Sequence, residues 1–390
     1  MFELISKECI KSDYQREIEK FTLSSESPIY VKIQGKTNEI ADSITWENPL
    51  KYAFEELSGY ALRLTGNRSY YQTSDNMSLD LNGYILNGSG YASCEYEIAQ
   101  MDAFKMYLDS KNIRLLYVNE PSKYLDDKYY EAQFGSESYL NDNMDRFLGA
   151  IGDKGIEYLD LRQSASEQEL DILEMFYKTD HHWRVPTSKW AASEIVHKMN
   201  KDYGYKINEA LYDDSNFQFA EFKNAWIGEQ GRLLSKALVG MDDYTAVWPA
   251  YKTDYTIIRP DGTIENTDFG AFLDTSVYYN DVVPYDSPLW HYSYQVGWGT
   301  LKDCHIHNND MEKGRILVLG DSYETCMVPF LSLGVSDIDF VCLRDAMISA
   351  KEVVEKGNYD MVIMAYAQFM LGSYDREDSD NRAMFNLVEE

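Results

Sequence analysis

The stretch Ile316-Leu317-Val318-Leu319-Gly320-Asp321-Ser322-Tyr323 decides the fold predicted for this chain. Its apolar first half is typical of a buried strand, and an apolar pattern at helical spacing follows from Met327 to Leu331. A strand, a tight turn and a helix in this order lift the Ser322 hydroxyl out of the sheet at a helix N-terminus. Backbone N–H groups there can stabilise a developing oxyanion, so Ser322 is a candidate nucleophile.

A serine hydroxyl becomes a nucleophile when a base takes its proton, and Thr179-Asp180-His181-His182-Trp183 offers one far upstream. Side chains alternate along an extended segment, so Asp180 and His182 would share a face, with Asp180 orienting the imidazole. Two other interpretations stay open, a core histidine and a metal site completed by His305 and His307. Adjacent histidines point in different directions, so we predict no metal there. Asp321 is expected to cap the helix after the serine.

Helical and strand patterns alternate along most of the chain, which predicts parallel βαβ units in an open sheet. Ligands of such sheets bind outside the carboxyl ends of the strands, where Ser322 is expected. Residues 205 to 305 interrupt this alternation with short alternating runs and turn residues, and they predict antiparallel strands and long loops. The predicted strands are Ile113–Val118, Ile156–Leu159, Arg315–Gly320, Ile338–Leu343 and Met361–Ala365.

Composition excludes several classes of function. Lys and Arg total 36 against 65 Asp and Glu, a formal net charge of −29 that repels nucleic acid and anionic lipid. The five cysteines are odd in number and widely spaced, so neither a zinc motif nor a disulfide framework is expected. No signal-peptide pattern and no run of 18 apolar residues occurs, so the chain as written is expected to be soluble.

The two motifs resemble the DHHW protein family, which is related to the SGNH-hydrolase-like domains of the alginate O-acetylation proteins AlgX and AlgJ. The resemblance rests on Phe176–Trp183 and Ile316–Tyr323 in that order, and it covers roughly residues 80 to 370. Further segments that resemble the family are Val118–Lys123 with its Pro-x-Lys turn, Tyr158–Arg162, Pro329–Ser332 and Phe340–Arg344.

This resemblance implies a three-layer α/β/α, flavodoxin-like SGNH fold built on a parallel sheet. It also implies circular permutation, because the histidine motif precedes the serine motif, with the β-rich insertion at about 205–305 between them. Residues 1–78 are expected to form an N-terminal region packed on the main domain of residues 79–390. The implied triad is Ser322, His182 and Asp180. A Gly-x-Asn-Asp segment is missing, so the usual asparagine oxyanion donor is unassigned.

Four further residues are candidates for oxyanion stabilisation or substrate binding. The backbone N–H of Tyr323 is a candidate hydrogen-bond donor to the oxyanion. Arg344, at a strand end, is a candidate to bind a charged group of the substrate or to pair with Asp345. His181 and Tyr366 are candidates for the site wall, and Gln368 is a weaker one.

The leading hypothesis is a serine acyltransferase of SGNH type that acetylates hydroxyls of a cell-surface or extracellular polysaccharide through an acetyl-serine. The alternatives are a carbohydrate acetylesterase with the same triad and a non-catalytic glycan-binding or assembly protein. No cofactor is expected and the acetyl donor is open. The expected partners are a glycan acceptor and a membrane-bound acetyl-donor protein, without nucleic acid. Family resemblance places the protein outside the cytoplasm, although a cytoplasmic location also fits a chain without a signal.

Overall fold

The computed structural model describes residues 51–66, 69–71, 76–272, 304–346, 348–371 and 380–388. The chain divides into two compact units, Met1–Gly66 and Asn67–Glu390. Of the first unit the structure describes helix α3, Lys51–Thr65. That the N-terminal region packs on the main domain stays a prediction. Among the described residues no helix is long and apolar enough to cross a membrane.

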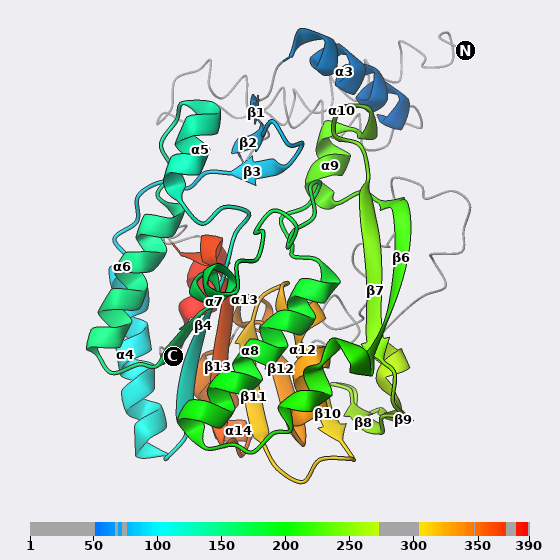
Figure 1. Ribbon diagram of the computed structural model, residues 1–390. Helices are drawn as coiled ribbons and strands as arrows, with labels where there is room; N and C mark the ends of the chain where they lie inside the picture. Colours follow the sequence, from blue (N-terminus) through cyan, green and yellow to red (C-terminus); the bar gives the residue numbers. More distant parts are fainter. Residues whose placement is uncertain are drawn as a thin grey trace, which may run out of the picture. The chain divides into compact units, whose positions relative to one another are not determined.

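An eight-stranded sheet organises the second unit, in the order β5-β4-β13-β11-β12-β10-β8-β9 (Figure 1). The first five strands are parallel, and the last three continue the sheet in antiparallel pairs. The strands are β4 Arg114–Glu120, β5 Tyr158–Asp160, β8 Tyr255–Ile258, β9 Ile264–Thr267, β10 His305–Asn308, β11 Arg315–Gly320, β12 Asp337–Val341 and β13 Met361–Ala367.

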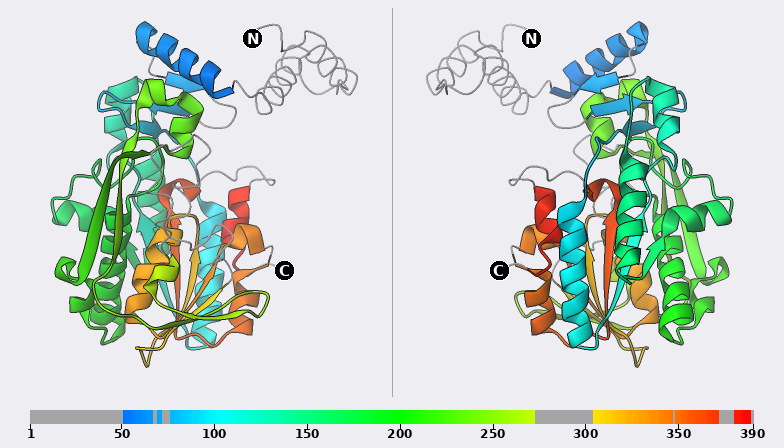
Figure 2. Two further views of the ribbon diagram at one scale, coloured as in Figure 1. Left: turned by 90° about the vertical axis from the view of Figure 1, so that its right-hand side faces the viewer. Right: turned by 90° about the vertical axis from the view of Figure 1, so that its left-hand side faces the viewer.

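Helices cover both faces of this sheet. Figure 2 shows α8 and α12 on one face and α4 and α14 on the other, which confirms the predicted α/β/α layers. The described helices of this unit are α4 Glu95–Ser110, α5 Asp127–Phe134, α6 Leu140–Asp153, α7 Leu161–Glu167, α8 Val185–Tyr203, α9 Glu229–Leu234, α10 Lys236–Val239, α12 Glu324–Leu331, α13 Leu343–Ala346 and α14 Ala350–Lys356. Helix α8 has Pro186 in its first turn, where the missing N–H of proline costs no helical hydrogen bond.

The β-rich insertion is less separate than its composition indicates. Strands β6, Phe217–Trp226, and β7, Asp242–Pro249, form an antiparallel pair of their own. Strands β8 and β9 instead lengthen the main sheet through β10, so backbone hydrogen bonds join the insertion to the parallel core. Residues 273–303 of the insertion lie outside the described residues. A separate three-stranded sheet contains β1 Ser69–Tyr71, β2 Asn76–Leu79 and β3 Ile85–Asn87.

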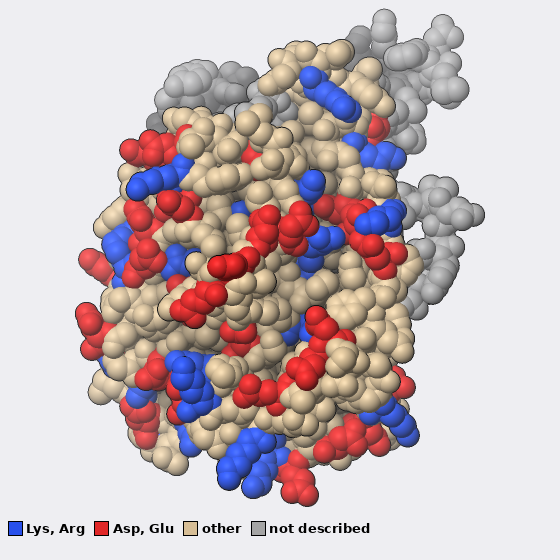
Figure 3. Space-filling view, in the orientation of Figure 1, with Lys and Arg blue, Asp and Glu red and all other residues tan. Residues whose placement is uncertain are grey.

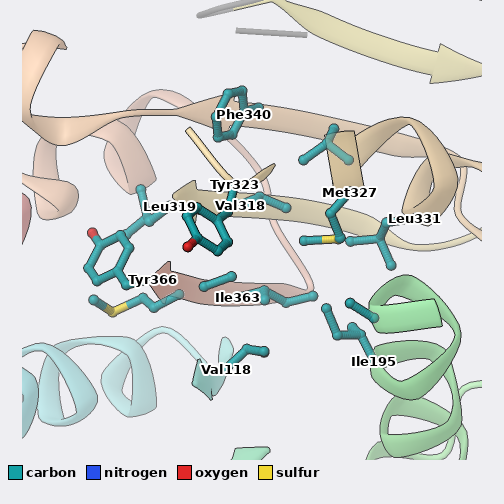
Figure 4. Packing of buried hydrophobic residues seen from close by; sticks show 14 of the residues in the cluster. Val118, Ile195, Val318, Leu319, Tyr323, Met327, Leu331, Phe340, Ile363 and Tyr366 are labelled. Atoms are coloured by element: carbon teal, nitrogen blue, oxygen red, sulfur yellow. The ribbon is translucent and has the colours of Figure 1, made fainter. Parts of the chain in front are cut away.

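The core lies between the central strands and their helices. Val318 of β11 and Ile363 of β13 are neighbours in register and fully buried, since a strand covered on both faces has no polar side. Figure 4 shows Met327 and Leu331 of α12 turned toward Ile195 of α8. Burying each such side chain contributes about 1.5–3 kcal/mol. This packing fixes where α12, and the serine turn before it, leaves the sheet.

Candidate active site

Ser322 lies in the tight turn that joins β11 to α12. Gly320 ends the strand, and a Cβ at this position would lie 2.5 Å from Cγ of Glu324, so a larger residue would displace that side chain. Oε2 of Glu324 accepts a hydrogen bond from the N–H of Asp321 at 2.6 Å. A carboxylate from the first residue of the helix therefore closes the turn that presents the serine.

Asp321 ties this turn to the adjacent strand. Its Oδ1 accepts a hydrogen bond from the N–H of Tyr323 at 2.9 Å, and its Oδ2 accepts one from the N–H of Ala367 at 2.8 Å. The prediction that Asp321 caps α12 is wrong, because the helix begins at Glu324 and its N-cap residue Tyr323 has no side-chain cap. Asp321 instead fixes the turn before the helix to the end of β13. The prediction that the Tyr323 N–H serves the oxyanion is wrong, because that N–H is bonded to Asp321. Among the described residues, the N–H of Ser322 has no hydrogen-bond partner.

The histidine lies in a closed loop between Phe176 and Trp183, which form an isolated antiparallel bridge. Within this loop Oδ1 of Asp180 accepts hydrogen bonds from the backbone N–H of His182 at 2.9 Å and from its Nδ1 at 2.6 Å. The segment is a bend and not the extended segment predicted from the sequence. A local turn of the aspartate side chain, and not strand alternation, therefore brings Asp180 to His182.

The structure brings this loop against the serine turn. Nε2 of His182 lies 2.6 Å from Oγ of Ser322, although the two residues are 140 positions apart. With Nδ1 bound by Asp180 and Nε2 facing the hydroxyl, the imidazole is placed to take the serine proton. Both ring nitrogens are thus engaged within the site, which leaves this imidazole poorly placed for the alternative metal site at Asp180-His181-His182.

Two hydrogen bonds lock the loop and the turn together. The indole Nε1 of Trp183 donates to the carbonyl of Tyr323 at 3.2 Å, and the Tyr323 hydroxyl donates to the carbonyl of His181. The two rings are 5.3 Å apart between centroids. Because each segment supplies one donor and one acceptor, the distance between His182 and Ser322 is set by bonds on both sides of the pair.

A second set of contacts holds Asp180 from behind. Its Oδ2 accepts a hydrogen bond from the N–H of Glu229 at 2.7 Å, and the N–H of Gly228 donates to Thr179 Oγ1 at 2.8 Å. A Cβ on Gly228 would lie 2.3 Å from Cβ of Asp180, so only glycine lets the chain approach this closely. Asp242 accepts the N–H groups of Lys178 at 2.8 Å and Thr179 at 2.9 Å. Sequence reasoning misses these residues, since no motif links them to the loop.

A buried lysine supports the start of the same loop. Nζ of Lys123 donates to the carbonyls of Ile85 at 2.7 Å and Lys178 at 3.3 Å. Burial lowers the pKa of Lys123 to about 8, even though Asp180, Asp242 and Asp80 act to raise it. The lysine of the Pro-x-Lys segment therefore supports the histidine loop through hydrogen bonds.

Electrostatics keep Asp180 ionised. Burial alone would raise its pKa, but the neighbouring imidazoles of His182 and His181 and the hydrogen bonds from His182 hold the pKa below its ordinary value. Burial and the charge of His182 lower the pKa of His181 to about 3, so this second imidazole is neutral near pH 7. The site then has one charged carboxylate at the imidazole that faces Ser322.

A buried acidic group lies behind the serine turn. Carboxylate oxygens of Glu120, Asp321 and Glu324 all lie within 4.8 Å of one another. Burial raises the pKa of Glu120 and of Glu324 well above the usual range, with further repulsion from the neighbouring carboxylates. Three carboxylates this close cannot all be charged in a dry environment, so the group holds at least one proton at neutral pH. Glu120 and Glu324 carry no recognisable sequence signal.

The remaining predicted residues have different places. Tyr366 is fully buried and its hydroxyl donates to the carbonyl of Met384 at 2.7 Å, so its prediction as a substrate-binding residue is wrong. Gln368 is buried too and donates to Asn141 Oδ1 at 2.8 Å, so it is not part of an open wall. Arg344 is half-buried in α13, and its charge only partly offsets the burial that raises the pKa of Asp321. His181 keeps 29% of its side chain exposed, edge-on to Phe369.

Comparisons with known proteins agree with the fold. Residues 85–238 match the family model described as "SGNH hydrolase-like domain, acetyltransferase AlgX". This segment contains the histidine loop and ends before the serine turn. No curated protein matches this chain.

Two solved structures are similar over most of their length. The structure of Bacillus cereus PatB1 with sulfonyl adduct has a TM-score of 0.61 at 17% identity, over 82% of this chain and 100% of that one. A DHHW family protein from Eubacterium siraeum has a TM-score of 0.58 at 14% identity, over 83% of this chain and 98% of that one. The predicted resemblance and the SGNH hydrolase-like fold are confirmed.

Proposed function

We propose that this protein is an SGNH-type serine acyltransferase that acetylates hydroxyl groups of a cell-surface or extracellular polysaccharide. The observation that carries the proposal is the 2.6 Å approach of His182 Nε2 to Ser322 Oγ, with Asp180 at the other ring nitrogen. The family model matched by residues 85–238 is described as an acetyltransferase, which supports acyl transfer as the reaction. The proposed location of this protein is outside the cytoplasm. The proposed source of the acetyl group is a membrane-bound protein.

In the first half-reaction Ser322 Oγ attacks the acetyl carbonyl of the donor while its proton passes to His182 Nε2. The charge of Asp180 stabilises the imidazolium that forms. The donor's leaving group departs with that proton, and an acetyl ester remains on Ser322. The N–H of Ser322 is the proposed backbone donor to the oxyanion, since the Tyr323 N–H is bonded to Asp321.

In the second half-reaction a sugar hydroxyl takes the place of the leaving group. His182 removes the hydroxyl proton, the sugar oxygen attacks the acetyl carbonyl, and the Oγ–acyl bond breaks as the proton returns to Ser322. His181, neutral and partly exposed beside Phe369, is proposed to line the acceptor side. Arg344 is proposed to bind a charged group of donor or acceptor.

Surface charge is compatible with a glycan acceptor and opposes nucleic acid. On the face drawn in Figure 3 basic side chains lie singly or in small groups among acidic ones. A net charge of −29 favours neutral or basic ligands over polyanions.

The test uses p-nitrophenyl acetate with the wild type and the variants Ser322→Ala and His182→Ala, with Ser166→Ala on the exposed side of α7 as the matched control. We expect an acetyl group on Ser322 by mass spectrometry after a brief reaction, and acetylated sugar once an oligosaccharide acceptor is added. Turnover unchanged in folded Ser322→Ala would sink the proposal. Acetyl-serine that yields only free acetate with every acceptor would assign hydrolysis instead.

A further inference from the structure

A second group of titratable side chains lies near the amino end of β11, whereas Ser322 follows the carboxyl end of that strand. Strands β10 and β12 pair antiparallel, with His305 opposite Asp339 and His307 opposite Asp337. Residues two apart on a strand share a face, so all four side chains lie on one face of the sheet. The row of Asp337 is also the row of Arg315, the first residue of β11, whereas Ser322 follows the last. The length of β11, about 17 Å, therefore separates this cluster from the serine.

Three of these side chains aim ligand atoms at one point. Oδ1 of Asp337 lies 3.2 Å from Nε2 of His305 and 2.9 Å from Nδ1 of His307. The ligand atoms of His305, His307 and Asp337 all lie within 4.8 Å of one another. A tetrahedral zinc ion with bonds of about 2.0–2.2 Å separates its ligands by about 3.4 Å, so only a small outward movement is needed to admit an ion.

Hydrogen bonds orient two of these ligands from outside. Oδ1 of Asp339 lies 2.8 Å from Nδ1 of His305, which leaves Nε2 of that ring toward Asp337. The Tyr359 hydroxyl in turn donates to Asp339 Oδ2 at 2.6 Å, and the Ser336 hydroxyl donates to Asp337 Oδ2 at 2.7 Å. A carboxylate on the far nitrogen of a histidine is the usual support of a metal-bound imidazole, because it fixes the tautomer and raises basicity.

The charges and the exposure fit a divalent ion. The carboxylate of Asp337 contacts both imidazoles and that of Asp339 contacts His305 from the far side, while Arg315 of β11 lies in the row of Asp337. The side chains of His305, His307 and Asp337 keep 28%, 39% and 16% exposure, so water can reach the site as a fourth ligand. Two imidazoles with one carboxylate favour zinc or a similar transition metal over calcium or magnesium, which prefer oxygen.

We propose that His305 Nε2, His307 Nδ1 and Asp337 Oδ1 bind one divalent transition-metal ion, with Asp339 as the supporting carboxylate. The ion joins β10, through which the antiparallel extension enters the sheet, to β12 of the parallel core. Its role is to stabilise that junction, away from the serine.

The test is a titration of the full chain, prepared without a histidine tag and dialysed against a chelator, with Zn²⁺ alone in a calorimeter. We expect one ion per chain with a Kd of micromolar or below, and tetrahedral Co²⁺ absorption when Co²⁺ replaces Zn²⁺. His307→Gln and Asp337→Asn should weaken binding at least 100-fold. His197→Gln is the matched control, because it removes another imidazole 3.1 Å from a carboxylate on the exposed side of α8.

Thermal unfolding of each variant without metal checks that it is folded, and Zn²⁺ should raise the melting temperature of the wild type and of His197→Gln only. An absence of saturable binding, or an affinity unchanged in folded His307→Gln and Asp337→Asn, would overturn the proposal. A loss of stoichiometry in His182→Ala with retention in His307→Gln would assign the ion to the histidine loop and overturn it equally.

Discussion

Two carboxylate–imidazole pairs lie at opposite ends of one sheet, and they differ in what faces the second nitrogen of the imidazole. In both, an aspartate oxygen lies close to Nδ1, at 2.6 Å for Asp180 and His182 and at 2.8 Å for Asp339 and His305. Nε2 of His182 faces the hydroxyl of Ser322, whereas Nε2 of His305 faces the carboxylate of Asp337. The shared pair therefore does not decide the chemistry; the third partner does.

Burial separates the two pairs as well. Asp180 is fully buried and is bound by the backbone N–H groups of His182 and Glu229. Asp339 keeps 27% exposure and is held by a tyrosine hydroxyl and an imidazole. A carboxylate fixed by backbone donors cannot follow a moving ligand, which suits proton transfer over a fixed distance. A partly exposed carboxylate can adjust by a few tenths of an ångström, which suits an arriving ion.

The largest effect is expected from Asp180→Asn, which breaks the pair at the serine end. The imidazole loses its orienting charge, so the rate of Ser322 acetylation by p-nitrophenyl acetate should fall by about 10²–10⁴. Zn²⁺ affinity should stay within twofold of the wild type. Asp261→Asn, in an exposed turn, is the control. An acetylation rate within threefold of the wild type in Asp180→Asn would remove Asp180 from the proposed triad.

Asp339→Asn tests the pair at the other end. An amide supports the His305 tautomer less strongly than a carboxylate, so calorimetry should show Zn²⁺ affinity reduced by about 10–100-fold. Glu312→Gln, on an exposed loop near β10, should leave the affinity unchanged. Equal affinities in Asp339→Asn and the wild type would show that the two pairs are not alike in how an aspartate supports its histidine.

Gly228→Ala perturbs the serine end without changing any catalytic group. The added Cβ meets Asp180 at 2.3 Å, so the carboxylate must move away from His182. A displacement of this kind should lower the acetylation rate about tenfold or more with little change in substrate affinity. Gly149→Ala in α6 is the matched control, since its Cβ meets nothing within 4 Å. Equal rates in the two variants would show that the approach of Gly228 is not needed.

The stability contributed by the buried glutamates behind the serine turn and that contributed by Asp337 should depend on pH with opposite signs. The pKa values of Glu120 and Glu324 are raised in the fold, so the folded chain holds more protons and this contribution to stability is lost as pH rises above the ordinary glutamate range. Burial would raise the pKa of Asp337, but hydrogen bonds from Ser336 and His307 lower it, so its contribution is lost as pH falls below about 4.

Glu120→Gln isolates the first of these effects. The free energy of unfolding of the wild type should fall between pH 5 and pH 8 more steeply than that of the variant, by at most about 1.4 kcal/mol per pH unit for one retained proton. Urea titrations at three pH values measure the slopes, with Glu131→Gln on the surface as the control. Identical slopes in the wild type and Glu120→Gln would mean that Glu120 is ionised throughout.

Much of this architecture could be predicted because its signals are local. The alternation of helical and strand patterns predicted the parallel strands, and Gly-Asp-Ser after a buried strand predicted the serine turn. Between β12 and β13 the chain forms two short helices, α13 and α14, and a capping box at Ser349 and Glu352 begins the second. The extension of the main sheet by β8 to β10 was missed, because strand partners are chosen by tertiary contacts that no local pattern records.

The errors at the candidate site have the same cause. The sequence predicts Tyr366 in the site wall because it follows the last predicted strand, but Tyr366 belongs to β13 and its ring packs edge-on against Tyr117 and Phe385 in the core. The position of a residue at a strand end does not fix the direction of its side chain. Asp242, Gly228, Glu120 and Glu324 were missed for the complementary reason, since ordinary residues acquire a role only where distant segments meet.

The sequence by itself determined the strand–turn–helix around Ser322, the Asp180–His182 pair and the order of the two motifs, since each depends on neighbours within a few positions. Only the tertiary structure decided that Ser322 and His182 meet at 2.6 Å and that Asp337 faces His305. It also decided that Tyr323 gives its hydroxyl to the histidine loop. The physical reason is that these contacts arise from packing of α12 against α8 and from strand register, which are set by burial of the whole core.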